Sequence, residues 1–296
     1  MKNLNKKSYG FFLVIALGSC THSPKEIDLE KQVWIHGSAD CKTNTEPLIQ
    51  VMQYNTDTWI LRQNKCVHYE APFIFLLMGE EQSLLVDTGA TGDEKYFPLR
   101  NVVDSILLAN GGSNKNLIVA HSHSHSDHVA ADDQFKNRFN TEVIGLSWDA
   151  IQKYFSLDSN NSASTIELGN RQIKILSIPG HHQTSLAFYD SQTRLLFTGD
   201  TFYPGRLYVR DWFAFKKSIK RLLLFAKENK VRQFIGNHIE MTNQKRIDYP
   251  IGSTYQPDED VLPLAIEQLK ELGQALDRLG DSPKREVHDH FIIYPK

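Results

Sequence analysis

The chain has 296 residues, of which 41% are hydrophobic and 23% are charged. A chain of this length buries enough surface to form a large core without help from disulfides or metals. Its composition excludes disordered, collagen-like and polytopic membrane proteins. The formal net charge is −2, and after residue 10 lysines and arginines occur at most in adjacent pairs. This charge distribution argues against a nucleic-acid partner.

Residues 1–19 have the pattern of a secretory signal peptide. Residues 1–10 carry three lysines and no acid, and the apolar run Phe11–Gly18 leads to Cys20. About eight apolar residues are too few to cross the ~30 Å hydrocarbon layer of a membrane, so cleavage is expected rather than a membrane span. Removal of residues 1–19 takes away three lysines and no acid, which changes the net charge from −2 to −5.

The segment Leu17-Gly18-Ser19-Cys20 resembles a bacterial lipobox. The resemblance implies that Cys20 is lipidated, that residues 20–40 are a lipidated N-terminus and tether, and that the protein is exported and anchored in the membrane of the cell envelope. Thr21 resembles the residue at this position in lipoproteins sorted to the outer membrane, which implies the periplasmic side of that membrane. The alternatives are an ordinary signal peptide with a chance cysteine and an uncleaved apolar anchor.

The two remaining cysteines, Cys41 and Cys66, are 25 residues apart and form no CxxC motif. In an oxidising compartment such a pair is most simply a disulfide, which contributes roughly 3 kcal/mol on the loop-entropy model. Two buried free thiols are the alternative. Either interpretation gives the cysteines a structural role.

The rest of the chain mixes strand and helix patterns. Runs rich in β-branched and aromatic residues predict strands at Leu48–Tyr54, Thr58–Arg62, Phe73–Met78, Ser83–Asp87, Asn116–Ala120, Glu142–Gly145, Ser164–Leu168, Gln172–Ile178, Ser185–Asp190, Leu195–Phe197 and Phe291–Tyr294. Amphipathic spacing predicts helices at Leu99–Ala109, Phe215–Ala226 and Leu262–Leu279. No repeat or low-complexity linker divides these elements, so residues 41–296 are expected to form a single α/β domain.

Histidines concentrate where a metal site would need them. Seven of the twelve lie between residues 121 and 238, and four of those occur in the segment 121–128 directly after an apolar strand. Imidazole and carboxylate groups suit zinc and its neighbours. Histidines two residues apart can face one ion, while Asp127 and His128 face another side. A metal-scavenging tract or an ordinary surface loop is the alternative.

Five motifs in order resemble those of the metallo-β-lactamase superfamily. His123-Ser-His125-Ser-Asp127-His128 resembles its HxHxDH signature. The other four are Asp87-Thr88-Gly89, Pro179-Gly180-His181, Phe197-Thr198-Gly199-Asp200 and Gly236-Asn237-His238. The resemblance implies an αββα sandwich, in which two mixed sheets pack between helices.

The resemblance also implies a dinuclear metal site with two Zn²⁺ ions, although iron or manganese would accept the same ligands. It assigns His123, His125 and His181 to one ion and Asp127, His128 and His238 to the other. Asp200 would bridge the ions and Asp87 would brace the metal loop. A metal-bridging hydroxide, oriented by Asp127, would then attack a substrate carbonyl.

Departures from individual branches of the family narrow the substrate. Position 200 is Asp rather than the Cys of several zinc β-lactamases, and the segment 200–206 lacks the Gly-Cys-Gly-Arg run usual in hydroxyacylglutathione hydrolases. Tyr203 resembles a lactonase phenol that donates to the developing oxyanion, although it is equally a wall residue. We therefore expect hydrolysis of a small ester or lactone.

Several alternatives stay open at this point. A β-lactamase or a thioesterase of the same superfamily is the nearest, and a noncatalytic envelope protein that binds a metal or ligand is another. A phosphodiester nuclease is disfavoured because the acidic mature chain would repel a polyanion. His121 and His182 are expected to lie near the ligands or at the surface, and Glu240 either orients His238 or is an ordinary surface residue.

Overall fold

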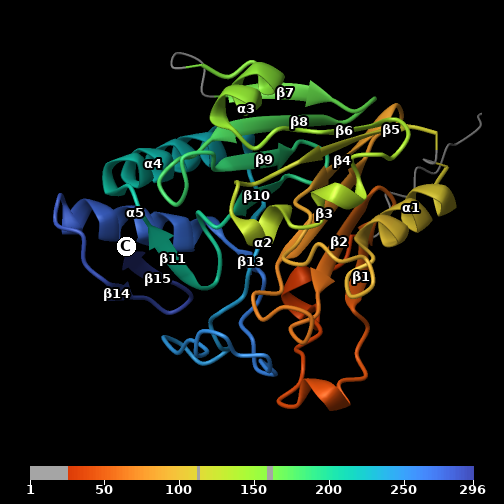
Figure 1. Cartoon of the computed structure of the whole chain (residues 1–296). Helices are drawn as coiled ribbons and strands as arrows, with labels where there is room; N and C mark the ends of the chain where they lie inside the picture. The colour runs from red at the N-terminus through yellow and green to blue at the C-terminus, as the bar shows by residue number, and fades with distance from the viewer. Residues whose placement is uncertain (1–25, 112–113, 159–162) are drawn as a thin grey trace, which may run out of the picture.

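The computed structural model describes residues 26–111, 114–158 and 163–296, which form two six-stranded sheets, one three-stranded sheet and five α-helices (Figure 1). The predicted signal peptide and Cys20 lie outside the described residues. Among the helices that are described, none combines the length and hydrophobicity needed to cross a bilayer.

The first sheet contains the strands of the N-terminal half in sequence order. Its strands are β1 (Ile49–Asn55), β2 (Thr58–Gln63), β3 (Phe73–Met78), β4 (Gln82–Val86), β5 (Asn116–Ala120) and β6 (Thr141–Val143). The strands β1 to β4 pair antiparallel, whereas β4, β5 and β6 are parallel. The helix α1 (Leu99–Ala109) joins β4 to β5 because parallel neighbours need a crossover connection.

The second sheet has the order β13-β12-β10-β9-β8-β7. Its strands are β7 (Ala163–Glu167), β8 (Gln172–Ser177), β9 (Leu186–Asp190), β10 (Leu195–Gly199), β12 (Gln233–Gly236) and β13 (Pro263–Leu264). The strands β10 and β12 are parallel, and the helix α4 (Trp212–Asn229) makes the crossover between them. The helix α5 (Ile266–Leu279) follows β13.

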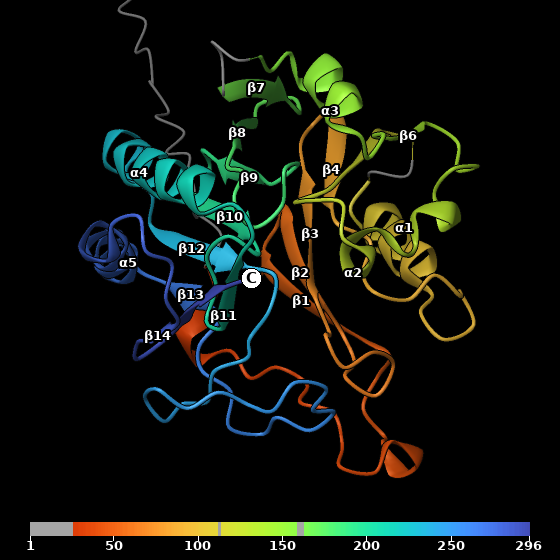
Figure 2. The same cartoon turned by 60° about the vertical axis from the view of Figure 1, so that its left-hand side comes forward.

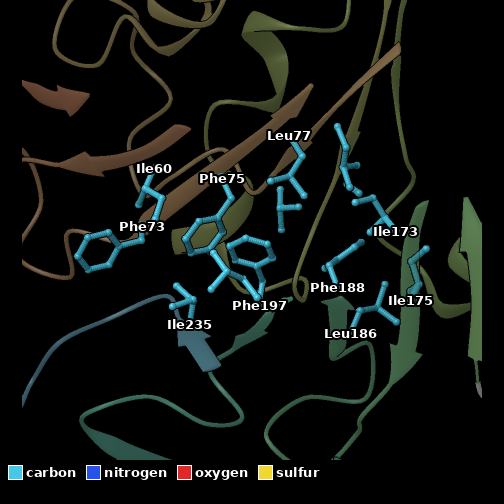
Figure 3. Packing of buried hydrophobic residues seen from close by; sticks show 14 of the residues in the cluster. Ile60, Phe73, Phe75, Leu77, Ile173, Ile175, Leu186, Phe188, Phe197 and Ile235 are labelled. Atoms are coloured by element: carbon cyan, nitrogen blue, oxygen red, sulfur yellow. The ribbon is translucent and has the colours of Figure 1, made fainter. Parts of the chain in front are cut away.

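The hydrophobic core lies in three layers that explain the stacking of the elements. Between the sheets, Phe75 of β3 meets Phe197 of β10 with ring centroids 4.5 Å apart, within a cluster that draws on both sheets (Figure 3). The outer face of the first sheet packs on α1, and the outer face of the second sheet packs on α4 and α5 (Figure 2). The predicted αββα sandwich is therefore confirmed.

The structure contains several short elements that the sequence patterns did not predict. These are α2 (Ser126–Val129), α3 (Trp148–Phe155), β11 (Arg206–Val209), β12, β13 and β14 (Glu286–Val287). In addition, β13 occupies the start of the predicted helix Leu262–Leu279, so α5 begins only at Ile266. Elements of two to eight residues are too short to show a reliable period. The strands β11, β14 and β15 (Ile292–Pro295) form the three-stranded sheet.

The described part of the expected tether, residues 26–40, is folded against the rest of the chain. Leu29, in the 3₁₀ turn η1 (Leu29–Lys31), is 1% exposed, and the Trp34 ring stands edge-on to Phe73 at 4.8 Å. Gly37 forms a β-bridge with Tyr255. The expectation of an extended tether therefore differs from the structure over these residues. Isolated apolar side chains such as Leu29 and Trp34 show no period that sequence reasoning could detect.

Cys41 and Cys66, the expected pair, form a disulfide with their Cα atoms 5.2 Å apart. Cys41 belongs to the 3₁₀ turn η2 (Cys41–Thr43), and Cys66 lies in the loop between β2 and β3. The bond therefore ties the N-terminal segment to a loop of the first sheet.

The Cys41→Ser/Cys66→Ser variant should lose about 3 kcal/mol of unfolding free energy, because the disulfide restricts the unfolded chain over a 25-residue separation. Urea denaturation of the two proteins measures the loss. Reductant should shift the wild-type midpoint by the same amount and leave the variant unchanged. An unchanged midpoint in the variant would contradict a stabilising role for the bond.

Candidate metal centre

The five family-like motifs meet at one edge of the sandwich. The strands β4 and β5 of the first sheet are parallel, and β8, β10 and β12 of the second sheet all run in one direction. The carboxyl ends of each of these sets therefore lie at the same edge, where the loops that follow carry the polar residues. The short helix α2 holds Asp127 and His128 directly after the loop that contains His123 and His125.

Three histidines form the first ligand group, with His123, His125 and His181 within ligating distance of one another. His125 Nδ1 lies 2.8 Å from His123 Nε2 and 3.0 Å from His181 Nε2. The three ring nitrogens thus converge on one point, as the sequence spacing of His123 and His125 predicted.

The second group joins Asp127, His128, Asp200 and His238. Asp127 Oδ2 lies 3.0 Å from His128 Nε2 and 3.4 Å from His238 Nε2. The two imidazole Nε2 atoms are 3.4 Å apart. The structure therefore brings together all seven residues that the resemblance named as ligands.

Asp200 stands between the two groups. Its Oδ2 lies 3.9 Å from His123 Nε2 and 3.7 Å from His181 Nε2, whereas its Oδ1 lies 3.6 Å from His128 Nε2 and 3.3 Å from His238 Nε2. One carboxylate oxygen thus faces each group, which is the arrangement that a bridging ligand requires.

The donor set fits divalent cations. Two nitrogen ligands bonded at about 2.0–2.1 Å to a tetrahedral zinc lie roughly 3.3–3.4 Å apart. The distances within the second group, from 3.0 to 3.6 Å, bracket that value, and the 2.8 and 3.0 Å distances within the first group lie slightly below it. Asp200 Oδ1 is buried and accepts no hydrogen bond from the described residues. A buried carboxylate oxygen without a hydrogen bond is costly unless it meets a charge or a metal, so this atom is placed as a metal ligand would be.

Asp87 braces the loop that carries the ligands. The carboxylate is fully buried at the end of β4, where it accepts hydrogen bonds from the Ser122 backbone N–H at 2.6 Å and from the Ser122 hydroxyl at 2.8 Å. Its Oδ2 also lies 3.0 Å from His128 Nδ1 and accepts from Asn237 Nδ2 at 2.6 Å. Such an outer contact fixes the tautomer of a ligating imidazole.

Backbone carbonyls orient two further histidines. His181 Nδ1 lies 2.9 Å from the Tyr208 carbonyl oxygen, and His238 Nδ1 lies 3.0 Å from the Glu70 carbonyl oxygen. Glu240, considered as a partner of His238, instead contacts Arg206 and Tyr203. No residue type signals a carbonyl acceptor, so sequence reasoning had no means to find these two contacts.

The surroundings shift the histidine pKa values of the two groups in opposite directions. Burial lowers the pKa of His123 and His181, and it lowers the pKa of His125 to about 4. Burial also opposes the charged form of His238, but Asp200 and Asp127 outweigh it and raise the pKa of His238 to about 9. The pKa of His128 is raised well above its ordinary value for the same reason, because neighbouring carboxylates outweigh the effect of burial. The carboxylates thus provide the negative potential that cations would share.

A cavity of about 390 Å³ opens onto this centre. Five of the seven residues line it, namely His125, Asp127, His181, Asp200 and His238. Lys65, Tyr69 and Glu70 line it from the β2–β3 loop, and residues 250–253 and Gln256 line it from the loop between β12 and β13. A small molecule in the cavity would therefore contact residues of both candidate metal-ligand groups.

Tyr203 lines the cavity, and its hydroxyl is engaged by other groups of the protein. The hydroxyl donates to the Arg206 carbonyl oxygen at 2.5 Å and lies 3.1 Å from Glu240 Oε2. Its ring packs beside His238, with the ring centroids 5.8 Å apart. A phenol has a single proton to donate, so these contacts support the wall role and not the oxyanion-donor role.

His121 and His182 lie beside the centre as expected. His121 is buried, with its Nε2 2.9 Å from Asp132 Oδ1, and Asp132 in turn accepts from the Thr88 hydroxyl. His182 Nδ1 lies 2.8 Å from the Thr184 hydroxyl. Neither histidine belongs to the two ligand groups.

The sequence profile of the metallo-beta-lactamase superfamily matches residues 70–272, a range that contains all seven residues of the two groups. Similar curated proteins include a hydroxyacylglutathione hydrolase of Rhizobium etli, 25% identical over 51% of this chain and 57% of its own length. Another, from Chelativorans sp., is 30% identical over 34% of this chain and 41% of its own length. The chain thus spans about half of these two relatives.

The human acyl-coenzyme A thioesterase MBLAC2 is 24% identical over 62% of this chain and 77% of its own length. Among solved structures, a metallo-beta-lactamase from Pontibacter korlensis matches with a TM-score of 0.53 at 16% identity, over 77% of this chain and 99% of that one. A metallo-beta-lactamase from Erythrobacter litoralis matches with a TM-score of 0.55 at 14% identity, over 80% of this chain and 99% of that one. At these identities the structures share the fold.

Asp87→Ala should weaken metal binding by about 10–100-fold, the usual cost of losing an outer contact to a ligand. Competition against a chromophoric chelator measures this affinity. Asp132→Asn is the matched control, because Asp132 is a buried carboxylate that contacts His121 rather than a member of the ligand groups. Equal effects of the two substitutions would contradict the bracing role of Asp87.

Proposed function

The chain belongs to the metallo-β-lactamase superfamily, and from that premise we propose that it is a metal-dependent hydrolase of a small ester or thioester. The observation that carries the proposal is Asp200, whose two carboxylate oxygens face two separate ligand groups beneath one cavity. The similar curated proteins include a hydroxyacylglutathione hydrolase and an acyl-coenzyme A thioesterase, which favours a thioester as the first substrate to test.

Two divalent cations would supply Lewis acidity at the substrate carbonyl and would lower the pKa of a nearby water toward neutrality. His123, His125 and His181 would hold one cation, and Asp127, His128 and His238 would hold the other. Asp200 would contact both. Zinc suits these imidazole and carboxylate donors, as do iron and manganese.

The chain's own residues decide how a substrate approaches. His123 and His128 are buried behind the other ligands, whereas Asp127, Asp200 and His238 line the cavity. A scissile carbonyl therefore enters from the cavity side, where it meets the Asp127 carboxylate. That carboxylate would orient a water and hold the proton that the water releases. The cavity volume of about 390 Å³ is within the usual range for a small-molecule site.

A lactone is no longer the favoured substrate. Tyr203 favours a lactone only if its hydroxyl is free to donate to the substrate, and that hydroxyl donates instead to the Arg206 carbonyl oxygen. The Asp at position 200 continues to disfavour β-lactam cleavage. A noncatalytic envelope protein that binds a metal or ligand is the competing proposal from another class.

Asp200→Asn should reduce hydrolysis by about 100-fold or more, because the variant loses a carboxylate that faces both ligand groups. Acid release in a pH-stat measures the rate on a thioester, an aryl ester, a lactone and a β-lactam. Chelation of the wild-type protein should abolish the same activity. Full activity in the variant would contradict the dinuclear assignment. No activity on any substrate, with two metals bound per chain, would favour the binding protein.

We also propose that the protein is exported and lipid-anchored through Cys20, on the periplasmic side of the outer membrane. The lipobox-like segment that ends at Cys20 supports this location. Cys20→Ser should release the protein from the membrane fraction without changing hydrolysis, because the metal ligands lie more than 100 residues along the chain. Fractionation and immunoblotting measure the release. Retention in the membrane would indicate an uncleaved apolar anchor instead.

A further inference from the structure

A buried excess of positive charge lies beside the cavity, away from the metal ligands. Arg62 is fully buried and donates two hydrogen bonds to the Glu259 carboxylate, at 2.5 and 2.6 Å. Lys65 is 2% exposed and faces the same carboxylate at 3.6 Å. One carboxylate therefore serves two buried cations, and Arg62 already occupies both of its oxygens.

The Lys65 ammonium group has unused hydrogen-bonding capacity. It has three protons to donate, and its one described hydrogen bond reaches the Tyr69 carbonyl oxygen at a long 3.4 Å. Burial and the neighbouring Arg62 charge lower the pKa of Lys65 to about 8. A buried charge without a full set of partners is costly, and this one lines the cavity that opens onto the metal centre.

A buried polar atom without a hydrogen-bond partner among the described residues lines the same cavity. Gln256 is 4% exposed, and its Oε1 has no hydrogen-bond partner among the described residues. The oxygen and nitrogen of an amide are assigned by their surroundings, so this group can present either an N–H or an oxygen to a ligand. Lys65 and Gln256 together therefore provide donors for an anionic group.

The backbone holds these two residues in one wall. Gly37 packs so closely that an added Cβ would lie 2.8 Å from Lys65 Cβ and 2.1 Å from the Thr254 carbonyl oxygen. The backbone N–H of Gln256 donates to the His36 carbonyl oxygen at 2.9 Å. The disulfide at Cys66 fixes the residue next to Lys65. Segments around residues 37, 65 and 255 thus meet as one built unit.

We propose that Lys65 and Gln256 form a subsite for a carboxylate carried by the substrate, on the cavity wall formed by the β2–β3 loop and the segment 253–256. The subsite rests on the proposed hydrolase function and deepens it, since it makes the substrate an ester or thioester that bears a carboxylate. One carboxylate oxygen would accept from Lys65 Nζ and the other from the Gln256 amide.

Other cations near the cavity are less suited to this role. Arg206 is already paired with Glu240 at 2.9 Å and with Asp248 at 2.6 Å. Arg210 and Lys296 are exposed to solvent, where an ion pair contributes little. An anionic ligand at Lys65 would neutralise a buried charge and would also accept the hydrogen bonds that the Lys65 ammonium group does not make within the protein.

The test uses two pairs of thioesters with the metal-loaded protein. The first pair places the carboxylate on the acyl side, with the S-ethyl monothioester of glutarate against S-ethyl thiopentanoate. The second pair places it on the leaving group, with S-acetyl-3-mercaptopropionate against S-propyl thioacetate. We expect KM for the charged member of one pair to be lower by about 10-fold or more, the effect of a hydrogen bond to a charged group.

Lys65→Met should remove that preference, measured as the ratio of KM for the neutral member to KM for the charged member of the pair, while Lys65→Arg should retain part of it. Lys115→Met is the matched control, because Lys115 Nζ also donates to a backbone carbonyl but lies outside the cavity. Equal losses on charged and neutral substrates, together with a lower melting temperature, would show that Lys65 is only a structural partner of Glu259. No preference in the wild-type protein would also overturn the proposal.

A binding measurement separates the subsite from the hydrolase function. The thioether 5-(ethylthio)pentanoate keeps the carboxylate but has no scissile carbonyl, and calorimetry measures its affinity. Lys65-dependent binding without hydrolysis of any thioester or ester would support the subsite and overturn the proposed function. Hydrolysis without Lys65-dependent binding would support the function and overturn the subsite.

Discussion

The buried carboxylate of Asp87 is the contact on which the rest of the centre depends. It sits at the end of β4 and binds Ser122 beyond β5, His128 in α2 and Asn237 beyond β12. A fully buried carboxylate is tolerated only when donors surround it, so the loops of both sheets must converge on it. The two sheets meet largely through apolar side chains, and Asp87 adds a polar anchor between them at this edge.

The metal groups follow from this convergence. Once Asp87 holds Ser122 and His128, the intervening residues His123, His125 and Asp127 have little freedom in where they point. The second sheet supplies Asp200 and His238 from the ends of the parallel strands β10 and β12. The open side of the resulting centre faces a cavity whose walls come from irregular loops, and those loops therefore determine the shape of a ligand that can reach it.

Much of this arrangement could be predicted from the sequence, because it depends on local patterns. Runs of β-branched and aromatic residues predicted most of the strands, and amphipathic spacing predicted the helices α1 and α4. The seven candidate ligands were implied by the resemblance of the five motifs to the metallo-β-lactamase superfamily, and residue type and spacing alone indicated a metal site only in the segment 121–128. Short elements such as α3 and β11 were missed, and the packed segment around Leu29 and Trp34 was predicted as a tether, because neither shows a period.

Residue type and order were enough to indicate the cysteine pair and, through the resemblance to the family, the layered fold and the candidate ligands. The contact between the Tyr203 hydroxyl and the Arg206 carbonyl oxygen became visible only in the folded chain, as did the backbone carbonyls of Glu70 and Tyr208 beside His238 and His181. Only the tertiary structure, too, places Lys65 and Arg62 against the single carboxylate of Glu259. Arg62 and Glu259 are almost 200 positions apart in the sequence, so no local pattern of the chain could have indicated that two buried cations share this carboxylate.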